Sequence, residues 1–159
     1  ASCPVPGKSS DELTAELAEL GGDLLVRTLP AIADGSAVWI EQDESLVTHA
    51  AKIAKAELRL DPATGTQDNE RRVLASSDAA PARCIVAGKQ VRIMRAAVAS
   101  PAPRLAAGVC SMSDKRLLLA CADGVLEATS IKPDGKREMD AASFCAGIRE
   151  ETAEWSKLA

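Results

Sequence analysis

The sequence predicts an α+β protein, mostly β, in which a small closed or partly open β-barrel lies between a helical N-terminal region and a C-terminal helix. Short apolar segments separated by turn dipeptides fill residues 82–133, and helical periodicity is confined to the flanks of that region. The aromatic fraction is only 2% against an apolar fraction of 47%. We therefore expect a core built from Leu, Val, Ile and Ala.

A long helix is predicted for residues 9–35, where leucines recur every three or four positions. Ser9 and Glu12 have the spacing of a capping box. Gly21-Gly22 weakens the middle of this segment, which leaves open one kinked helix or two short ones. Residues 37–55 have no sustained period and are predicted to form an extended connector with one helical turn.

The barrel is predicted from five short strands. Residues 56–61 alternate polar and apolar, and residues 66–76 have the charge order of a short helix. A hairpin candidate then turns at Gly88-Lys89. Further strand-like segments are residues 104–113, 115–124 and 124–133. Residues 139–159 are predicted to form the closing helix, with Asp140 as its N-cap.

This interpretation divides the chain into a linker region, residues 1–55, and a barrel domain with its closing helix, residues 56–159. The first residues contain neither a start methionine nor an apolar signal core, so we expect the sequence to be part of a longer protein. No run of 18 apolar residues occurs, which predicts no transmembrane helix. The five cysteines include no C-x-x-C pair, which favours buried thiols in a reducing compartment over disulfides or zinc.

Charge is distributed unevenly along the chain. The net charge is −7 over residues 1–50, +6 over residues 51–137 and −3 over residues 138–159. No acidic residue occurs in residues 79–113, which contain five basic ones. This asymmetry indicates a face for an anionic partner, although a solvated barrel surface with its acids elsewhere would give the same pattern.

No catalytic or metal-binding residue is predicted. His49 is the only histidine, and no recognisable nucleophile motif accompanies it. Asp43 and Glu44 are adjacent, so their side chains diverge, and a role at a helix entry is expected. Residues 51–137 contain no aromatic residue, so nucleic-acid binding would depend on phosphate contacts and on salt concentration.

The stretch QDESLVTHAAKIAKAELRLD, residues 42–61, resembles the segment that links the two domains of methionyl-tRNA formyltransferases. Residues 17–35, 88–98 and 122–147 are similar, in that order, to the end of the catalytic half, a barrel strand and the closing elements of that family. The resemblance covers nearly the whole chain. It departs where the family has tyrosine (His49), tryptophan (Pro62) and an Asn-Pro-Trp-Pro turn (residues 76–81).

The resemblance implies an oligonucleotide-binding-type (OB-like) barrel that helps to bind initiator methionyl-tRNA in translation initiation. It also implies a catalytic domain upstream, which uses 10-formyltetrahydrofolate, so neither a cofactor nor formyl transfer is expected of this chain alone. We expect a monomer without membrane contact. Its location would be the cytoplasm in a bacterium, and a mitochondrion or plastid in a eukaryote.

Six basic residues are predicted to contact the tRNA backbone: Lys52, Lys55, Arg59, Lys89, Arg92 and Lys136. Arg92 and Arg95 lie three apart in a strand and are expected on opposite faces. Two alternatives remain open. The acidic flanks and the replaced Trp-Pro turn would suit a protein-interaction module derived from the family. The similar domain of a formyltetrahydrofolate dehydrogenase would serve a folate enzyme without tRNA.

Overall fold

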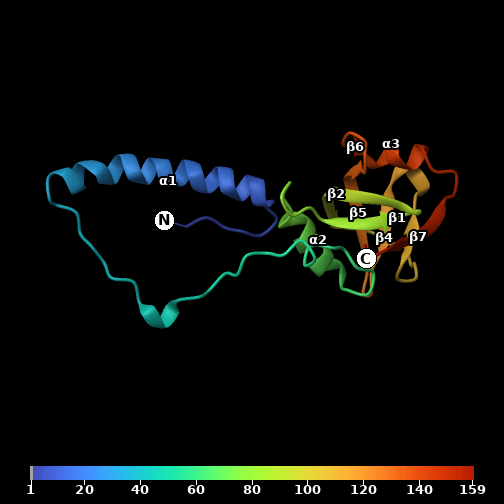
Figure 1. Cartoon of the computed structure of the whole chain (residues 1–159), viewed down its shortest axis with the longest axis horizontal. Helices are drawn as coiled ribbons and strands as arrows, with labels where there is room; N and C mark the ends of the chain where they lie inside the picture. The colour runs from blue at the N-terminus through green and yellow to red at the C-terminus, as the bar shows by residue number, and fades with distance from the viewer. Residues whose placement is uncertain (1) are drawn as a thin grey trace. The chain divides into compact units, whose positions relative to one another are not determined.

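The computed structural model describes residues 2–159, and the chain divides into two compact units at the boundary between Lys52 and Ile53. The first unit contains the helix α1 (Ser10–Ala33) and the short 3-10 helix η1 (Glu44–Leu46). The second unit contains every strand of the described chain (Figure 1).

The helix α1 is one continuous helix that passes through Gly21-Gly22. The predicted capping box is confirmed, because Ser9 accepts a hydrogen bond from the Glu12 backbone N–H and the Glu12 side chain accepts one from the Ser9 backbone. No residue of α1 is buried. The connector is also as predicted, with its single turn η1 capped by Asp43, which accepts from the Ser45 backbone N–H at 2.9 Å.

The second unit is a closed antiparallel barrel of six strands, which confirms the prediction of an OB-like barrel. The strands pair in the order β2-β1-β7-β3-β4-β5, and β5 returns to β2 to close the circle. The short β6 (Met139–Asp140) is added to β5. The barrel strands are β1 (Arg83–Val86), β2 (Lys89–Val98), β3 (Val109–Ser111), β4 (Leu117–Ala120), β5 (Val125–Pro133) and β7 (Thr152–Ser156). The 3-10 helix η2 (Ser113–Lys115) joins β3 to β4.

The first hairpin turns at Ala87-Gly88, one residue before the predicted position. Both residues have positive φ, 49° and 72°, as the tight turns of hairpins require. The turn places Val86 opposite Lys89 and Arg83 opposite Arg92. This register decides which side chains of the two strands lie on the same face of the sheet.

The core is aliphatic, as predicted, with few aromatic contributions. Four of the cysteines lie within it, and burial raises the pKa of the Cys84 thiol far above its usual range. These thiols are therefore unreactive packing groups, as the sequence indicated. The largest fully buried side chains are those of Leu60, Ile93, Leu117, Leu119, Leu126, Ile131 and Trp155.

The helix α2 (Thr66–Leu74) packs against β2 and β5 and is capped by a residue from a distant turn. The Asp123 carboxylate accepts from the backbone N–H of Thr66 at 2.7 Å and from its hydroxyl at 2.9 Å. Gly65 precedes the helix because a Cβ there would lie 2.8 Å from Asp123 Oδ2. The β4–β5 turn therefore also fixes the start of α2.

Two predicted elements are wrong. Residues 56–61 form turns and a single bridge from Arg59 to Arg83, because the alternation reflects the anchoring of Leu58 and Leu60 in the core rather than strand pairing. Residues 139–159 are not one helix. They form β6, the six-residue helix α3 (Ala141–Ala146) and then β7, because β1 and β3 both offer open edges for pairing. The N-cap role of Asp140 is confirmed.

Among residues 2–159, no helix is both long enough and apolar enough to cross a membrane.

Candidate nucleic-acid interface

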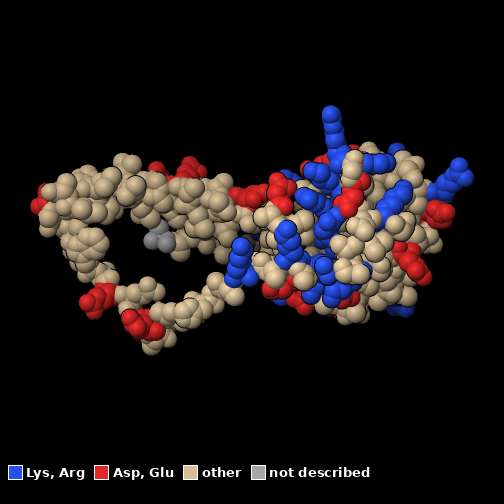
Figure 2. Space-filling model, viewed as in Figure 1, with Lys and Arg blue, Asp and Glu red and all other residues tan. Residues whose placement is uncertain are grey.

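Four basic residues lie side by side across one face of the barrel. Arg59 is bridged to Arg83, Arg83 lies opposite Arg92, and Arg92 lies opposite Lys132. We call Arg59, Arg83, Arg92 and Lys132 the basic row. Each alternates with buried neighbours in its own segment, so all four side chains point outward. Figure 2 shows Lys and Arg side chains gathered on the barrel face that this view presents.

A bulge brings a further arginine to the same face. The pairing of β2 with β5 shifts register between Ile93 and Arg95, so that Arg95 lies opposite Ser130. Ser130 and Lys132 are two apart in β5 and share its outer face. Arg95 therefore lies on the side of Arg92, and the expectation that the two arginines lie on opposite faces is wrong.

The basic row is held from behind by backbone contacts. Leu60 N donates to the Arg83 carbonyl at 2.9 Å, and Arg72 Nη1 donates to the Arg59 carbonyl at the same distance. These bonds fix the segment that carries Arg59 against the edge of β1. The row is thus built on hydrogen-bonded backbone, although Arg59 itself belongs to no strand.

Two of the four cations have carboxylate partners. Arg83 Nη2 pairs with both oxygens of Asp134, and Arg92 Nη1 lies 3.5 Å from Asp78 Oδ1. The Asp78 side chain is 95% exposed, so its pair with Arg92 is readily exchanged for another anion. No ion pair of Arg59 or Lys132 is present among the described residues. The row therefore keeps a positive potential.

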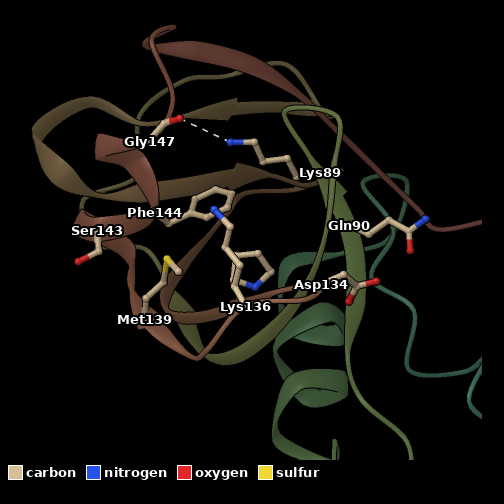
Figure 3. Close-up of a pocket in the computed structure, with 9 residues that line it drawn as sticks. Lys89, Gln90, Asp134, Lys136, Met139, Ser143, Phe144 and Gly147 are labelled. Carbon is tan, nitrogen blue, oxygen red and sulfur yellow. Dashed lines mark hydrogen bonds between the residues drawn. The ribbon is translucent and has the colours of Figure 1, made fainter.

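A pocket of about 440 Å³ lies at the end of the β1–β2 hairpin, where β5 leads into β6 and α3. We call it the hairpin pocket. Its walls include Lys89, Lys136, Met139 and Phe144. Lys89 Nζ lies 5.9 Å from the centre of the Phe144 ring and 3.5 Å from the Gly147 carbonyl oxygen, a long hydrogen bond (Figure 3).

Four of the six predicted contacts lie in the basic row or the hairpin pocket, and the other two lie elsewhere. Arg59 and Arg92 belong to the basic row, whereas Lys89 and Lys136 line the hairpin pocket. Lys55 is exposed in a turn before Arg59. Lys52 is exposed at the end of the first unit.

The sequence prediction did not include Arg83, Arg95 or Lys132. Arg83 could have been found by counting back from the hairpin, because a turn at Ala87-Gly88 places it opposite Arg92. Lys132 required the pairing of two strands that are distant in sequence, and Arg95 required the bulge. Neither feature has a local sequence signal.

The described residues contain no cluster of metal-binding side chains, and the single histidine lies outside the barrel unit. Within residues 2–159 no group of three or more His, Cys, Asp or Glu side chains could hold a metal ion. His49 is exposed in the connector of the first unit.

Comparison with known proteins adds a family and a fold. A family model described as the C-terminal domain of formyl transferase matches residues 52–149. Crystal structures of HypX from Aquifex aeolicus have a similar fold. A variant with four substitutions has a TM-score of 0.68 and 18% identity over 89% of this chain and 26% of that chain. A double variant has a TM-score of 0.67 and 18% identity over 99% of this chain and 30% of that chain.

A third HypX structure, solved in complex with tetrahydrofolic acid, has a TM-score of 0.59 and 18% identity over 77% of this chain and 22% of that chain. The present chain thus spans less than a third of the length of each of these proteins. At this level of identity the likeness concerns the fold alone.

Proposed function

This chain belongs to the formyl transferase C-terminal domain family, and on that premise we propose that it binds initiator methionyl-tRNA and positions it for formylation. The observation that carries the proposal is the basic row, in which Arg59, Arg83, Arg92 and Lys132 are aligned across the barrel. An unordered scatter of the same cations would have favoured a protein-interaction module or a folate-enzyme domain.

The chemistry of the row suits an RNA backbone. Arginine presents a planar fork of donors that matches two phosphate oxygens, and lysine adds a mobile point charge. The row has no aromatic member on which a base could stack, so contacts would be made to phosphates rather than to bases. Binding of this kind depends on the shape of a folded RNA and carries little sequence information.

We propose that formyl transfer itself takes place on a catalytic formyltransferase domain outside this chain, which would hold the folate-derived formyl donor. The barrel would contribute affinity for the side of the tRNA. Lys52 and Lys55 remain predicted contacts, and Arg83, Arg95 and Lys132 are added to Arg59 and Arg92 on the outer face.

The proposal is tested by measuring the affinity of the full chain for methionyl initiator tRNA at about 50 mM and about 200 mM salt. With about four phosphate contacts, the logarithm of the affinity falls with a slope of about −3 against the logarithm of the salt concentration, so fourfold more salt should weaken binding about 60-fold. The double variant R92E/K132E should bind more weakly and depend less on salt.

The matched control is R104E, which reverses the charge of an exposed arginine in the β2–β3 connection that takes no part in the pairing of the basic row. It should retain the affinity and the salt slope of the parent chain. A loss of affinity in R104E about half as large, on a logarithmic scale, as the loss in R92E/K132E would show that net charge, not the row, carries the binding. No binding at low salt would contradict the proposal and favour a protein-docking role.

A further inference from the structure

We propose that the hairpin pocket is a separate site for the dianionic phosphate of a phosphate monoester, held between Lys89 and Lys136. This inference goes beyond tRNA-backbone binding by the basic row, and it does not depend on it. The pocket lies at the end of the hairpin, and its volume of about 440 Å³ is in the range of small-ligand sites.

The two ammonium groups face the interior of the pocket. Figure 3 shows the side chains of Lys89 and Lys136 directed toward the Phe144 ring, whereas Asp134 and Gln90 turn away from it. Lys89 lies over the ring face and is only weakly bonded to the Gly147 carbonyl. The pocket therefore presents two positive charges to one small volume.

The carboxylates of the neighbouring chain segment are engaged elsewhere. Asp134 is paired with Arg83, and Glu138 accepts from the Ser130 hydroxyl. Asp140 accepts from the Ser143 backbone N–H at 2.7 Å, which lowers the pKa of its carboxyl. No ion pair of Lys89 or Lys136 is present in the part of the chain that the structure describes. An external anion is thus the partner that these two charges lack.

A phosphate monoester fits better than a backbone phosphodiester. A phosphodiester carries one charge, whereas a monoester carries close to two at neutral pH and has three acceptor oxygens for two ammonium groups. Met139 and Pro133 supply an apolar wall for the organic part of the ligand. The monoester could belong to a free small molecule or to the 5′ end of an RNA, since both offer the same group.

The first experiment titrates the full chain with adenosine 5′-monophosphate, and with adenosine as the uncharged control, by calorimetry or NMR. We expect binding of the nucleotide only, with at least a tenfold loss in K89Q/K136Q and recovery in K89R/K136R. The matched control R71Q/R104Q removes two charges at exposed positions outside the pocket and outside the basic row, and should leave binding unchanged. Circular dichroism checks that each variant is folded.

The pH dependence distinguishes the two charge states. The second pKa of a phosphate monoester is about 6, so the dianion fraction falls about fourfold from pH 7.5 to pH 5.5, and the affinity should fall with it. A site for singly charged phosphates would show no such loss. Absence of nucleotide binding at millimolar concentration, or equal binding by the parent chain and K89Q/K136Q, would overturn the proposal.

The source of the phosphate is distinguished by comparing an RNA hairpin that carries a 5′-phosphate with the same RNA ending in a 5′-hydroxyl. A preference for the 5′-phosphate that K89Q/K136Q abolishes assigns the pocket to an RNA end. Nucleotide binding without that preference assigns it to a small molecule. In either case R92E/K132E should retain nucleotide binding and any preference for the 5′-phosphate. The experiments therefore test the proposed role of the basic row and that of the hairpin pocket separately.

Discussion

Asn69 organises the entry to the barrel through a single buried side chain. Its Oδ1 accepts from the Asp61 backbone N–H at 3.0 Å, and its Nδ2 donates to the Asp61 carbonyl at 2.9 Å. The residue is fully buried in α2, so water cannot replace these bonds. One amide thus fixes the segment that follows Arg59 to the helix α2.

Replacing Asn69 by Ala should lower the free energy of unfolding by about 2–3 kcal/mol, because both backbone groups of Asp61 lose a buried partner. Urea unfolding of the parent chain and the variant measures this change. Gln67→Ala, at an exposed position of the same helix, is the control and should change stability by less than about 0.5 kcal/mol. Similar small effects at both positions would show that Asn69 is not a structural anchor.

Asp123 gives the cap of α2 a defined pH dependence. Hydrogen bonds from Thr66 hold the pKa of the Asp123 carboxyl below its ordinary value of 3.8. The folded form binds its proton less readily than the unfolded form, so the cap contributes stability above pH 3.8 and loses it as the pH falls through the lower, folded value.

We therefore expect Asp123→Ala to have a lower melting temperature than the parent chain at pH 7, and the difference to shrink as the pH falls below about 4. Thermal unfolding at several pH values measures both. The control is Asp68→Ala, which removes a carboxylate from the exposed first turn of the same helix that does not cap it. If the difference in melting temperature between the parent chain and Asp123→Ala persisted unchanged in strong acid, the charge of the Asp123 carboxylate would not stabilise the cap.

At the scale of elements, β7 is a segment whose local sequence pattern predicts a helix although the structure has a strand. Ala, Glu, Lys and Leu are good helix formers, and Trp155 lies at helical spacing from Ile148, so the segment suggests a helix. In the barrel, Trp155 N donates to the Gly108 carbonyl at 2.8 Å, and the Glu154 carbonyl accepts from Ala87 N at 2.9 Å. Pairing of β7 with both β1 and β3 outweighs the intrinsic helix preference of its residues.

Trp155→Phe should cost about 2–4 kcal/mol of stability, through the volume lost from the core and the unpaired carbonyl it leaves. The indole Nε1 donates to the Ala120 carbonyl at 2.9 Å, and the side chain is only 2% exposed. Chemical denaturation gives the comparison. Ser156→Ala, at the neighbouring exposed position of β7, should be nearly neutral. A loss below about 1 kcal/mol in Trp155→Phe would mean that β7 is not anchored by this residue.

Much of the barrel could be predicted because its strands are bounded by turn residues with a known conformational role. Asp123-Gly124 and the hairpin at Gly88 are examples, and α2 was visible from its charge order. The candidate site was harder to predict from the sequence. Arg59 and Arg92 could be named as cations, but their alignment depends on a bridge and on long-range register, which no short sequence window encodes.

At the scale of the whole molecule, the chain consists of two units of different character. The barrel unit, residues 53–159, has a closed sheet and a buried core, whereas the first unit contains a helix without buried residues and an exposed connector. Val38, Trp39 and Ile40 are more than 80% exposed. Stability and proteolytic sensitivity should therefore divide at this boundary.

Limited proteolysis should cut the connector, residues 36–52, and leave a resistant fragment that begins near residue 53. The fragment should unfold cooperatively at a melting temperature within a few degrees of the intact chain, because the barrel core lies wholly within it. Mass spectrometry locates the cuts and calorimetry gives the temperature. Early cuts inside β1–β5, or a fragment that unfolds without cooperativity, would contradict the division.

The position of β7 has a consequence for how the barrel is made on the ribosome. This strand is the last of the six to be synthesised, yet its place is between β1, the first, and β3. Until it emerges, those two edges remain unpaired and the sheet cannot close, however long the earlier strands have been available. Assembly therefore cannot proceed strand by strand from the N-terminal side. The growing chain must stay protected from pairing with other chains until its final strand is delivered.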